Sequence, residues 1–360
     1  MKIGLFSRVA ALLALSSAFA VPATAAGSDS IERQFDQTFG TETRVPPPQV
    51  LLPQVLLPQV RSATIQPWSS QTSTPRSYAS GLEAQLAAIA SAERGRIGVA
   101  AIDLATGRNI AVLGDQAFPL ASTSKIAIVA TFLQGVDDGR YRLNAQYPLM
   151  VPLASAKLSS AVAPVRPGQM VSALGLIELA LTRSDNQATD ALLAAVGGPQ
   201  AVNRWLRMAG LTGVRLDRDI ATLVRDDGVI NPTTSVDLRD STTPQAMVRL
   251  LSGLHQGAWL SPSSRAVLLG AMQRCVTGKR RMRALLPDGA MVAHKTGTLS
   301  NTSSDVGIIT TPDGRTIAVA IYVTGQGGKP NRDARIASIA RTIYDGYMAE
   351  APSLRRTASR

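Results

Sequence analysis

The stretch that decides the fold is Ser-Thr-Ser-Lys-Ile-Ala-Ile-Val-Ala, residues 122–130 of this 360-residue chain. Its apolar part predicts a helix that begins just after Ser122, so this serine lies where unpaired backbone N–H groups can help to bind a developing oxyanion. Lys125 follows one helical turn later on the same face. Because residues 116–135 hold no other charge, Lys125 is predicted to be buried. Burial near the positive end of a helix would lower its pKa and let it accept the Ser122 proton.

Two further strings follow in order: Ser-Asp-Asn at 184–186 and Lys-Thr-Gly at 295–297. Ser-Asp-Asn separates two helical runs, 171–181 and 187–195, where all three residue types also suit a plain helix cap. Lys-Thr-Gly ends a predicted strand that begins at Met291, and its glycine would let a substrate backbone approach. Each string is common by chance. In this order and at these spacings, they predict a serine nucleophile, a lysine base, a second hydroxyl and a cationic strand for a substrate carboxylate.

Strand patterns occur at both ends of this region, and helical patterns occupy its middle, from Ser122 to about Leu269. The predicted strands are 97–103, 109–113, 291–295, 306–310 and 316–323. The predicted outer helices are 82–92 and 332–347. We therefore expect the α/β class, with an antiparallel sheet from both termini flanked by helices and an inserted all-helical subdomain.

The N-terminus has the pattern of a secretory signal peptide over residues 1–25. Lys2 and Arg8 supply positive charge, residues 9–20 are mainly apolar, and a small-residue site precedes cleavage near Ala25. About a dozen apolar residues fall short of the roughly 20 that cross a bilayer. We expect a periplasmic or secreted protein.

Residues 26–80 form a predicted proline-rich linker. The pentad Pro-Gln-Val-Leu-Leu occurs at 48–52 and again at 53–57. Proline at every fifth position excludes a regular helix or a central strand, so we expect a flexible or extended chain. Its valines and leucines leave docking onto a partner or surface as the alternative. A compact domain is predicted over 81–350, followed by a basic tail over 351–360.

Composition excludes several classes of protein. Cys275 is the single cysteine, so no intrachain disulfide can form. With only His255 and His294 beside it, a typical zinc site cannot be filled, and we expect neither metal nor cofactor. The net charge of +12 has two interpretations, solubility or attraction to an acidic envelope surface. With 4% aromatic residues, nucleic-acid binding is not expected. We expect a monomer.

From Leu82 to Tyr347, the chain resembles the class A serine β-lactamase family. That family and the penicillin-binding proteins share Ser-x-x-Lys, Ser-Asp-Asn and Lys-Thr-Gly. The flanking sequences are similar too: Phe-Pro-Leu-Ala at 118–121, Gly-Gly-Pro at 197–199 and Arg-Asp-Ser-Thr-Thr-Pro at 239–244. The resemblance implies a β-lactamase/transpeptidase-like fold and an acyl-enzyme that opens β-lactam rings.

The resemblance also implies a role for each motif residue. Ser122 would be the acylated nucleophile, Lys125 its base, and Ser184 the group that passes a proton to the leaving nitrogen. The substrate would be held by Asn186 at its amide side chain, by Lys295, Thr296 and Arg281 at its carboxylate, and by the backbone N–H groups of Ser122 and Thr298 at the oxyanion.

One departure concerns deacylation. The family's deacylating glutamate lies on an Ω-loop that begins with Arg-Leu-Asp-Arg, here residues 215–218. The expected glutamate position is Ile220, and no Glu occurs between Glu178 and Glu350. The loop is also longer than is usual before Asp240, although Arg218 and Asp240 predict that a salt bridge still pins its ends.

Three aspartates could replace the missing base: Asp219, Asp226 and Asp227. Without a base, water would attack the acyl-enzyme slowly. Three hypotheses follow: a β-lactam hydrolase; a peptidase or esterase of the same fold, acting on cell-wall or other acyl substrates such as peptidoglycan; or a penicillin-binding protein that acylates and stalls.

Overall fold

The computed structural model describes residues 65–67 and 80–357. The predicted signal peptide, most of the predicted linker and the last three residues of the basic tail lie outside the described residues. All described residues belong to one unit of the chain.

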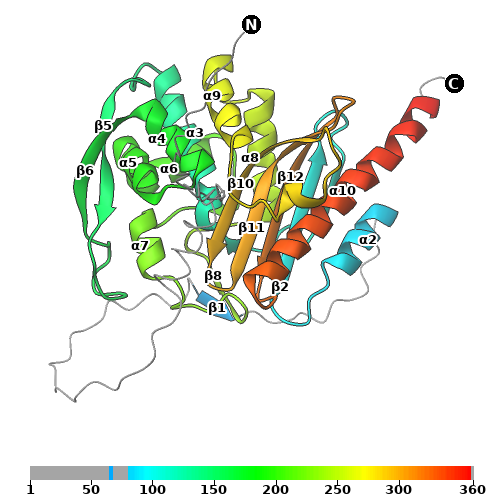
Figure 1. The fold of residues 1–360 in the computed structure, drawn as a ribbon, viewed down its shortest axis with the longest axis horizontal. Helices are drawn as coiled ribbons and strands as arrows, with labels where there is room; N and C mark the ends of the chain where they lie inside the picture. The colour runs from blue at the N-terminus through cyan, green and yellow to red at the C-terminus, as the bar shows by residue number, and fades with distance from the viewer. Residues whose placement is uncertain (1–64, 68–79, 358–360) are drawn as a thin grey trace, which may run out of the picture. The chain divides into compact units, whose positions relative to one another are not determined.

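The central element is a five-stranded antiparallel sheet with the order β10-β11-β12-β2-β3 (Figure 1). Its strands are β2 (Arg96–Asp103), β3 (Asn109–Val112), β10 (Met291–Leu299), β11 (Thr302–Thr310) and β12 (Thr316–Thr324). Two strands come from the N-terminal part of the domain and three from its C-terminal part, which confirms the predicted sheet from both termini.

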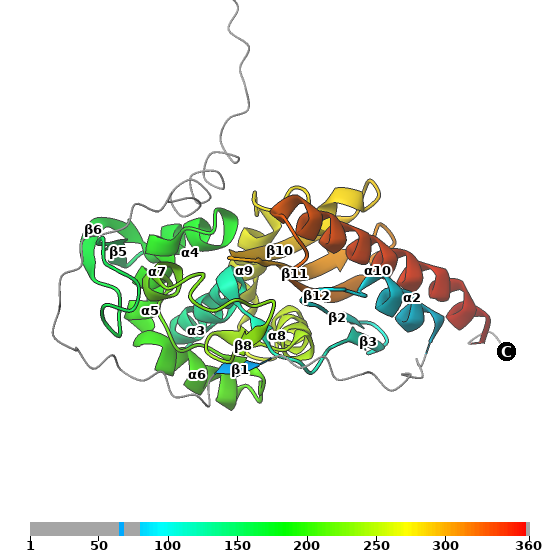
Figure 2. The same cartoon turned by 90° about the horizontal axis from the view of Figure 1, so that it is seen from below.

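Strand β12 shows how the sheet is covered on both faces. Ile317, Val319 and Ile321 belong to one buried cluster, whereas Ala318 and Ala320 belong to another. Successive side chains of a strand point to opposite faces, so the two clusters are the two layers of core. Helices α2 (Gly81–Ile89) and α10 (Lys329–Thr357) cover one face, and α8 (Pro244–Gln256) packs on the other (Figures 1 and 2).

An inserted group of helices builds the second part of the domain. It contains α3 (Lys125–Asp137), α4 (Ala173–Thr182), α5 (Asn186–Val196), α6 (Gly198–Met208), α7 (Ile220–Arg225) and α9 (Pro262–Gln273). Helix α3 is buried on every side from Lys125 to Leu133, as a central helix that is apolar all round should be. The apolar run after Ser122 therefore does specify the core of this helical part.

Residues 122–269 are mainly helical, as predicted, but the inserted part is not all-helical. Strands β5 (Gln146–Pro152) and β6 (Val165–Ser172) form an antiparallel hairpin there. The prolines in this segment disfavour a helix. The five central residues of β5 are half-buried, which is typical of a two-stranded ribbon that covers helices on one face. Three short strands, β4 (Phe118–Pro119), β7 (Val214–Arg215) and β9 (Ser241–Thr242), form a further small sheet.

The predicted linker contains one ordered piece. Strand β1 (Ile65–Pro67) pairs antiparallel with β8 (Ser235–Asp237), which lies in the lengthened part of the Ω-loop. Residues 65–67 are therefore a docked strand rather than free linker.

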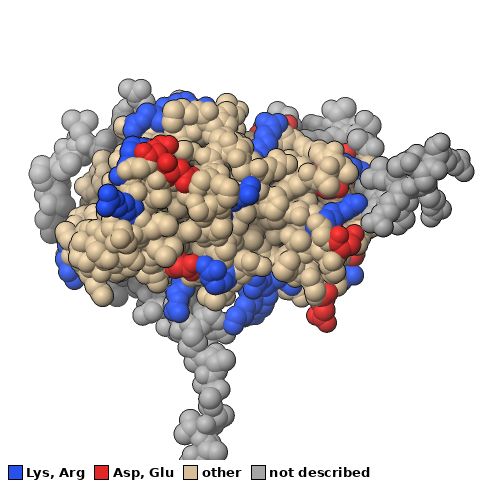
Figure 3. All heavy atoms as spheres, turned by 90° about the horizontal axis from the view of Figure 1, so that it is seen from above, with Lys and Arg blue, Asp and Glu red and all other residues tan. Residues whose placement is uncertain are grey.

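Charge on the described surface is divided into separate groups. Figure 3 shows Lys and Arg side chains on one face in several clusters, with Asp and Glu between them. That face holds no single continuous basic patch among its described residues. In the described part of the chain, no helix combines the length and apolar character needed to cross a membrane. No group of His, Cys, Asp or Glu there is arranged to hold a metal ion.

Candidate active site

Ser122 lies in a 3-10 turn, η2 (Ala121–Ser124), that leads directly into α3. The Thr123 hydroxyl donates to the Leu120 carbonyl (2.6 Å), and the Ser124 hydroxyl donates to the Ala121 carbonyl (2.9 Å); both side chains are buried. Ser122 is partly exposed. Of the three adjacent hydroxyls, Ser122 is therefore the one that is placed to meet a substrate.

Lys125 is completely buried, as predicted. Its Nζ donates to Asn186 Oδ1 (2.7 Å), to Ser184 Oγ (3.2 Å) and to the Ser184 carbonyl. Burial, followed by the positive charge of Lys295, holds the pKa of Lys125 well below its usual value, while Asp185 and Asp190 oppose the shift. A lysine in this environment can act as a base.

Ser184 is the point at which the two lysines meet. Its Oγ accepts hydrogen bonds from Lys295 Nζ (2.9 Å) and Lys125 Nζ (3.2 Å). Its φ of 61° is unusual for a residue with a side chain. Asp185 caps α5 by accepting from the Ala188 N–H (2.8 Å), so the Ser-Asp-Asn string is a helix cap and part of this polar cluster at once.

Strand β10 continues past Lys-Thr-Gly to Leu299, which corrects the prediction that the string ends the strand. A glycine is required at position 297 because neighbouring residues leave no room for a side chain. A Cβ on Gly297 would lie 2.4 Å from Ser304 Oγ and 3.0 Å from Ala121 Cβ. These distances bring β10 against the turn that carries Ser122, so Gly297 allows the strand and the nucleophile to pack together.

Arg281 is buried beneath the same strand. Its Nε bonds to Asp333 Oδ1 (2.7 Å), its Nη1 to the carbonyls of Gly297 (2.9 Å) and Ser304 (3.0 Å), and its Nη2 to Thr298 Oγ1 (2.8 Å). The guanidinium thus supports the end of β10 from within the protein. Thr298, which Arg281 holds, remains partly exposed.

The Ω-loop is pinned as predicted. Arg218 Nε lies 2.5 Å from Asp240 Oδ2, and Asp240 Oδ1 accepts from the backbone N–H groups of Asp217 (2.8 Å) and Arg218 (3.0 Å). Asp240 is 1% exposed and has a φ of 48°. Backbone strain of this kind, on the order of 1–3 kcal/mol, persists only where the surroundings enforce it.

Loss of this ion pair should destabilise the protein. Asp240→Ala leaves the half-buried Arg218 guanidinium with only its longer contact to Asp237 (3.4 Å) among the described residues, and it removes the Asp240 acceptor from the N–H groups of Asp217 and Arg218. We therefore expect the free energy of unfolding to fall by about 1.5–3 kcal/mol in urea titrations. Asp138→Ala is the matched control, because it removes an ion pair with Arg140 that is exposed on both sides (57% and 44%), and it should leave the urea midpoint unchanged. Equal shifts in the two variants would contradict the role of the pin.

Ile220 begins α7 and is 2% exposed, inside the main hydrophobic cluster. Its backbone N–H donates to Asp190 Oδ1 (2.7 Å), and the N–H of Ala221 donates to Asp190 Oδ2 (2.8 Å). Burial raises the pKa of Asp190 to about 7, although the two N–H groups and Lys125 oppose the shift. The sequence interpretation missed Asp190; its signal was one acidic residue within the otherwise uncharged helical run 187–195.

The three aspartates considered as substitute bases all have structural partners. Asp219 caps α7 by accepting from the Thr222 N–H (2.7 Å). Asp226 pairs with Arg225 (2.7 Å) and accepts from the Leu158 N–H (3.1 Å).

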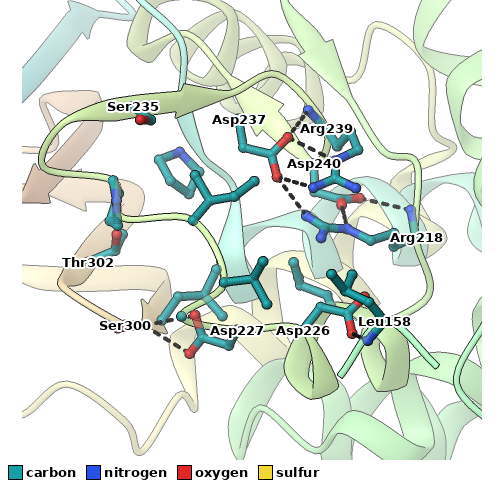
Figure 4. Close-up of a pocket in the computed structure, with 17 residues that line it drawn as sticks. Leu158, Arg218, Asp226, Asp227, Ser235, Asp237, Arg239, Asp240, Ser300 and Thr302 are labelled. Atoms are coloured by element: carbon teal, nitrogen blue, oxygen red, sulfur yellow. Dashed lines mark hydrogen bonds and ion pairs between the residues drawn. The ribbon is translucent and has the colours of Figure 1, made fainter. Parts of the chain in front are cut away.

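Asp227 reaches across to the turn between β10 and β11. Both of its carboxylate oxygens accept from the Ser300 N–H (3.0 and 2.9 Å). Asp226 and Asp227 line a cavity of about 60 Å³. Figure 4 shows them on one side of it, with the Arg218, Asp237 and Asp240 cluster on the other. Asp226 and Asp227 therefore tie the lengthened loop to its neighbours.

The fold and the site together define a serine hydrolase, and comparisons with known proteins agree. Residues 81–347 match the model of the β-lactamase enzyme family. The chain is 31% identical over 281 residues to β-lactamase Toho-1 of Escherichia coli, across 77% of this chain and 92% of that protein. It is 30% identical over 240 residues to the extended-spectrum β-lactamase PER-1 of Pseudomonas aeruginosa, across 63% of this chain and 74% of that protein.

Solved structures give the same result. An ancestral class A β-lactamase is 37% identical with a TM-score of 0.63, across 74% of this chain and 99% of that one. A β-lactamase from Xanthomonas campestris pv. campestris is 30% identical with a TM-score of 0.64, across 73% of this chain and 96% of that one. The chain therefore belongs to the β-lactamase enzyme family, as a serine β-lactamase with the class A fold.

Proposed function

We propose that this enzyme opens β-lactam rings through an acyl-enzyme on Ser122. The observation that carries the proposal is a partly exposed Ser122 that lies one helical turn before a completely buried Lys125, whose Nζ donates to Ser184 Oγ and whose pKa lies well below its usual value. Neutral Lys125 takes the proton from Ser122 Oγ as this oxygen attacks the lactam carbonyl. The backbone N–H groups of Ser122 and Thr298 stabilise the oxyanion that forms.

The proton then needs a route to the ring nitrogen, which leaves when the C–N bond breaks. Ser184 Oγ lies within hydrogen-bond distance of Nζ of Lys125. The protonated Lys125 gives its proton to Ser184, which passes its own proton to the nitrogen. Asn186, which holds Lys125 through Oδ1, is proposed to bind the substrate's amide side chain.

The substrate carboxylate is proposed to bind at β10. Lys295 supplies the charge, and Thr296 supplies a hydroxyl from the next residue. Arg281 is proposed to act here through Thr298, whose hydroxyl it holds at 2.8 Å. This placement uses the buried guanidinium without removing it from Asp333.

Lys295→Ala should lower kcat/KM more for substrates that carry a carboxylate than for neutral substrates. A charge-assisted hydrogen bond contributes about 1.5–3 kcal/mol, so kcat/KM for an anionic penicillin should fall by about one to two decades. A small neutral ester, hydrolysed by the same Ser122, serves as the internal control. Equal losses for both substrates would assign Lys295 a structural role through its bond to Ser184.

Deacylation is proposed to limit turnover. A buried Ile220 offers no base at the position where the family pattern places glutamate. Asp190 is the carboxylate that lies against this point, and both its oxygens already accept backbone N–H groups. Acyl-enzyme should therefore accumulate at steady state. A penicillin-binding protein that stalls after acylation is the limiting case of the same chemistry.

The test of the activity is the fate of a penicillin and a cephalosporin incubated with purified enzyme. Catalytic loss of the β-lactam absorbance, with a product heavier by one water, supports the proposal. Intact β-lactam together with cleavage of a peptidoglycan-derived peptide or an ester would favour the peptidase or esterase hypothesis. A periplasmic or secreted location, no nucleic-acid partner and a monomeric enzyme without a cofactor complete the proposal, on the sequence features given above.

A further inference from the structure

A second cluster of reactive side chains lies behind β10, outside the machinery described so far. It consists of Cys275, His294 and Asp305, all buried. His294 Nδ1 lies 2.8 Å from Asp305 Oδ1, and the imidazole interacts with the Cys275 thiol. Within the described residues, Nε2 of His294 has no hydrogen-bond partner. Cysteine, imidazole and carboxylate thus form one buried cluster beside Lys295.

Two hydroxyls connect this cluster to the proposed carboxylate site. Cys275 Sγ lies 3.2 Å from Thr277 Oγ1, and Thr277 Oγ1 lies 2.6 Å from Thr296 Oγ1. In both contacts either atom can be the donor. The direction of the chain is therefore decided at its ends, by the thiol on one side and by the substrate on the other.

The charges around the thiol make its ionisation accessible near neutral pH. Burial opposes the thiolate, but the neighbouring imidazole of His294, then the charge of Lys295 and the hydroxyl of Thr277, lower the pKa of Cys275 to about 7. Burial likewise opposes charge on His294, but Asp305 and Cys275 raise its pKa to about 9. Arg283, in the 3-10 helix η3 (Met282–Leu285), adds a positive charge at the Cys275 carbonyl (3.5 Å).

We propose that Cys275 is a positioning residue for the substrate carboxylate, because its protonation state sets, through Thr277, the direction in which the Thr296 hydroxyl donates. The inference rests on the proposed function, in which Thr296 binds that carboxylate. A thiolate only accepts, so Thr277 donates to sulfur and accepts from Thr296, whose proton then points away from the substrate. A thiol can donate to Thr277, which reverses the chain and frees the Thr296 proton for the carboxylate.

The sign follows directly. As pH falls through about 7, Cys275 gains a proton, Thr296 donates to the substrate, and the cluster gains positive charge, so anionic substrates are captured better. Cys275→Ser keeps a hydroxyl that donates and accepts but does not ionise in this range. Lys125 ionises in both proteins, so its effect cancels in the ratio of wild-type to variant kcat/KM.

The first experiment measures that ratio against pH for an anionic penicillin and a neutral ester. We expect the penicillin ratio to fall by about tenfold from well below to well above pH 7, the scale of one lost hydrogen bond to a charged group, and the ester ratio to stay constant. A penicillin ratio that does not change with pH would overturn the proposal.

The second experiment needs no substrate, so it separates this inference from the proposed function. The chain holds one cysteine, so its ultraviolet thiolate absorbance can be assigned without ambiguity. The wild type should form thiolate with a midpoint near pH 7, and Thr277→Val, which removes the hydroxyl donor, should raise the midpoint. A wild-type midpoint at the ordinary value for cysteine, or no change in Thr277→Val, would refute the hydrogen-bonded chain even if β-lactams are not hydrolysed.

Discussion

Ser122→Ala should abolish covalent labelling by penicillins while the protein still unfolds cooperatively at the wild-type denaturant concentration. The variant loses the oxygen that forms the acyl bond, and loss of a nucleophile costs on the order of 10⁶ in kcat in a serine protease. Intact-protein mass spectrometry after incubation with a penicillin measures the labelling directly.

The neighbouring serine provides the matched control. Ser124 carries the same hydroxyl two residues away, but it is buried and donates to the Ala121 carbonyl. The Ser124→Ala variant should therefore still be labelled covalently by the penicillin. Labelling that survives in Ser122→Ala, or is lost only in Ser124→Ala, would remove Ser122 as the nucleophile.

Lys125→Met should slow acylation by about 10²–10⁴-fold, the usual contribution of a positioned general base. Methionine fills the buried volume without a nitrogen that could accept the Ser122 proton. The measurement is the rate of adduct formation in rapid-mixing experiments, with circular dichroism as the check of folding.

A second substitution separates a base from a structural cation. Lys125→Arg keeps a positive charge that cannot be neutralised in a protein. If Lys125 acts as a base, the arginine variant should be as slow as the methionine variant. An arginine variant with nearly wild-type acylation would show that Lys125 serves only as a charge that holds Ser184 and Asn186.

The features that the sequence predicts well are those set by local pattern. The apolar run in 317–323 and the turn before it are enough to predict the strand at 316–323. The uncharged run around Lys125 predicts its burial, because no other charged residue in that run marks a solvent-exposed face of the helix. Arg218 and Asp240 lie 22 residues apart, and only the family resemblance linked them; the structure joins them.

The features that were missed depend on contacts between distant residues. Asp190 looks like one polar residue in a helix until α7 places two backbone N–H groups on its carboxylate. Gly297 was interpreted as room for a substrate, because the sequence does not show that Ala121 and Ser304 occupy that space. Strand β1 was assigned to a linker because its partner lies about 170 residues further along, in the lengthened Ω-loop.

The cluster of Cys275, His294 and Asp305 is the clearest example. From the sequence alone, Cys275 suggests only a disulfide or a zinc site with the two histidines, and the chain has too few of these residues for either. Packing of β10 against β11 places His294 beside Asp305, and the loop after α9 brings Cys275 to the same point.

The most direct test of the account is a mass-spectrometric time course of the wild-type enzyme with excess penicillin, followed by peptide mapping. We predict an adduct with the mass of the intact penicillin, carried by the peptide that contains Ser122 and still abundant while substrate is being consumed. Rapid consumption of penicillin with no adduct at any time, or an adduct on a peptide without Ser122, would contradict the account.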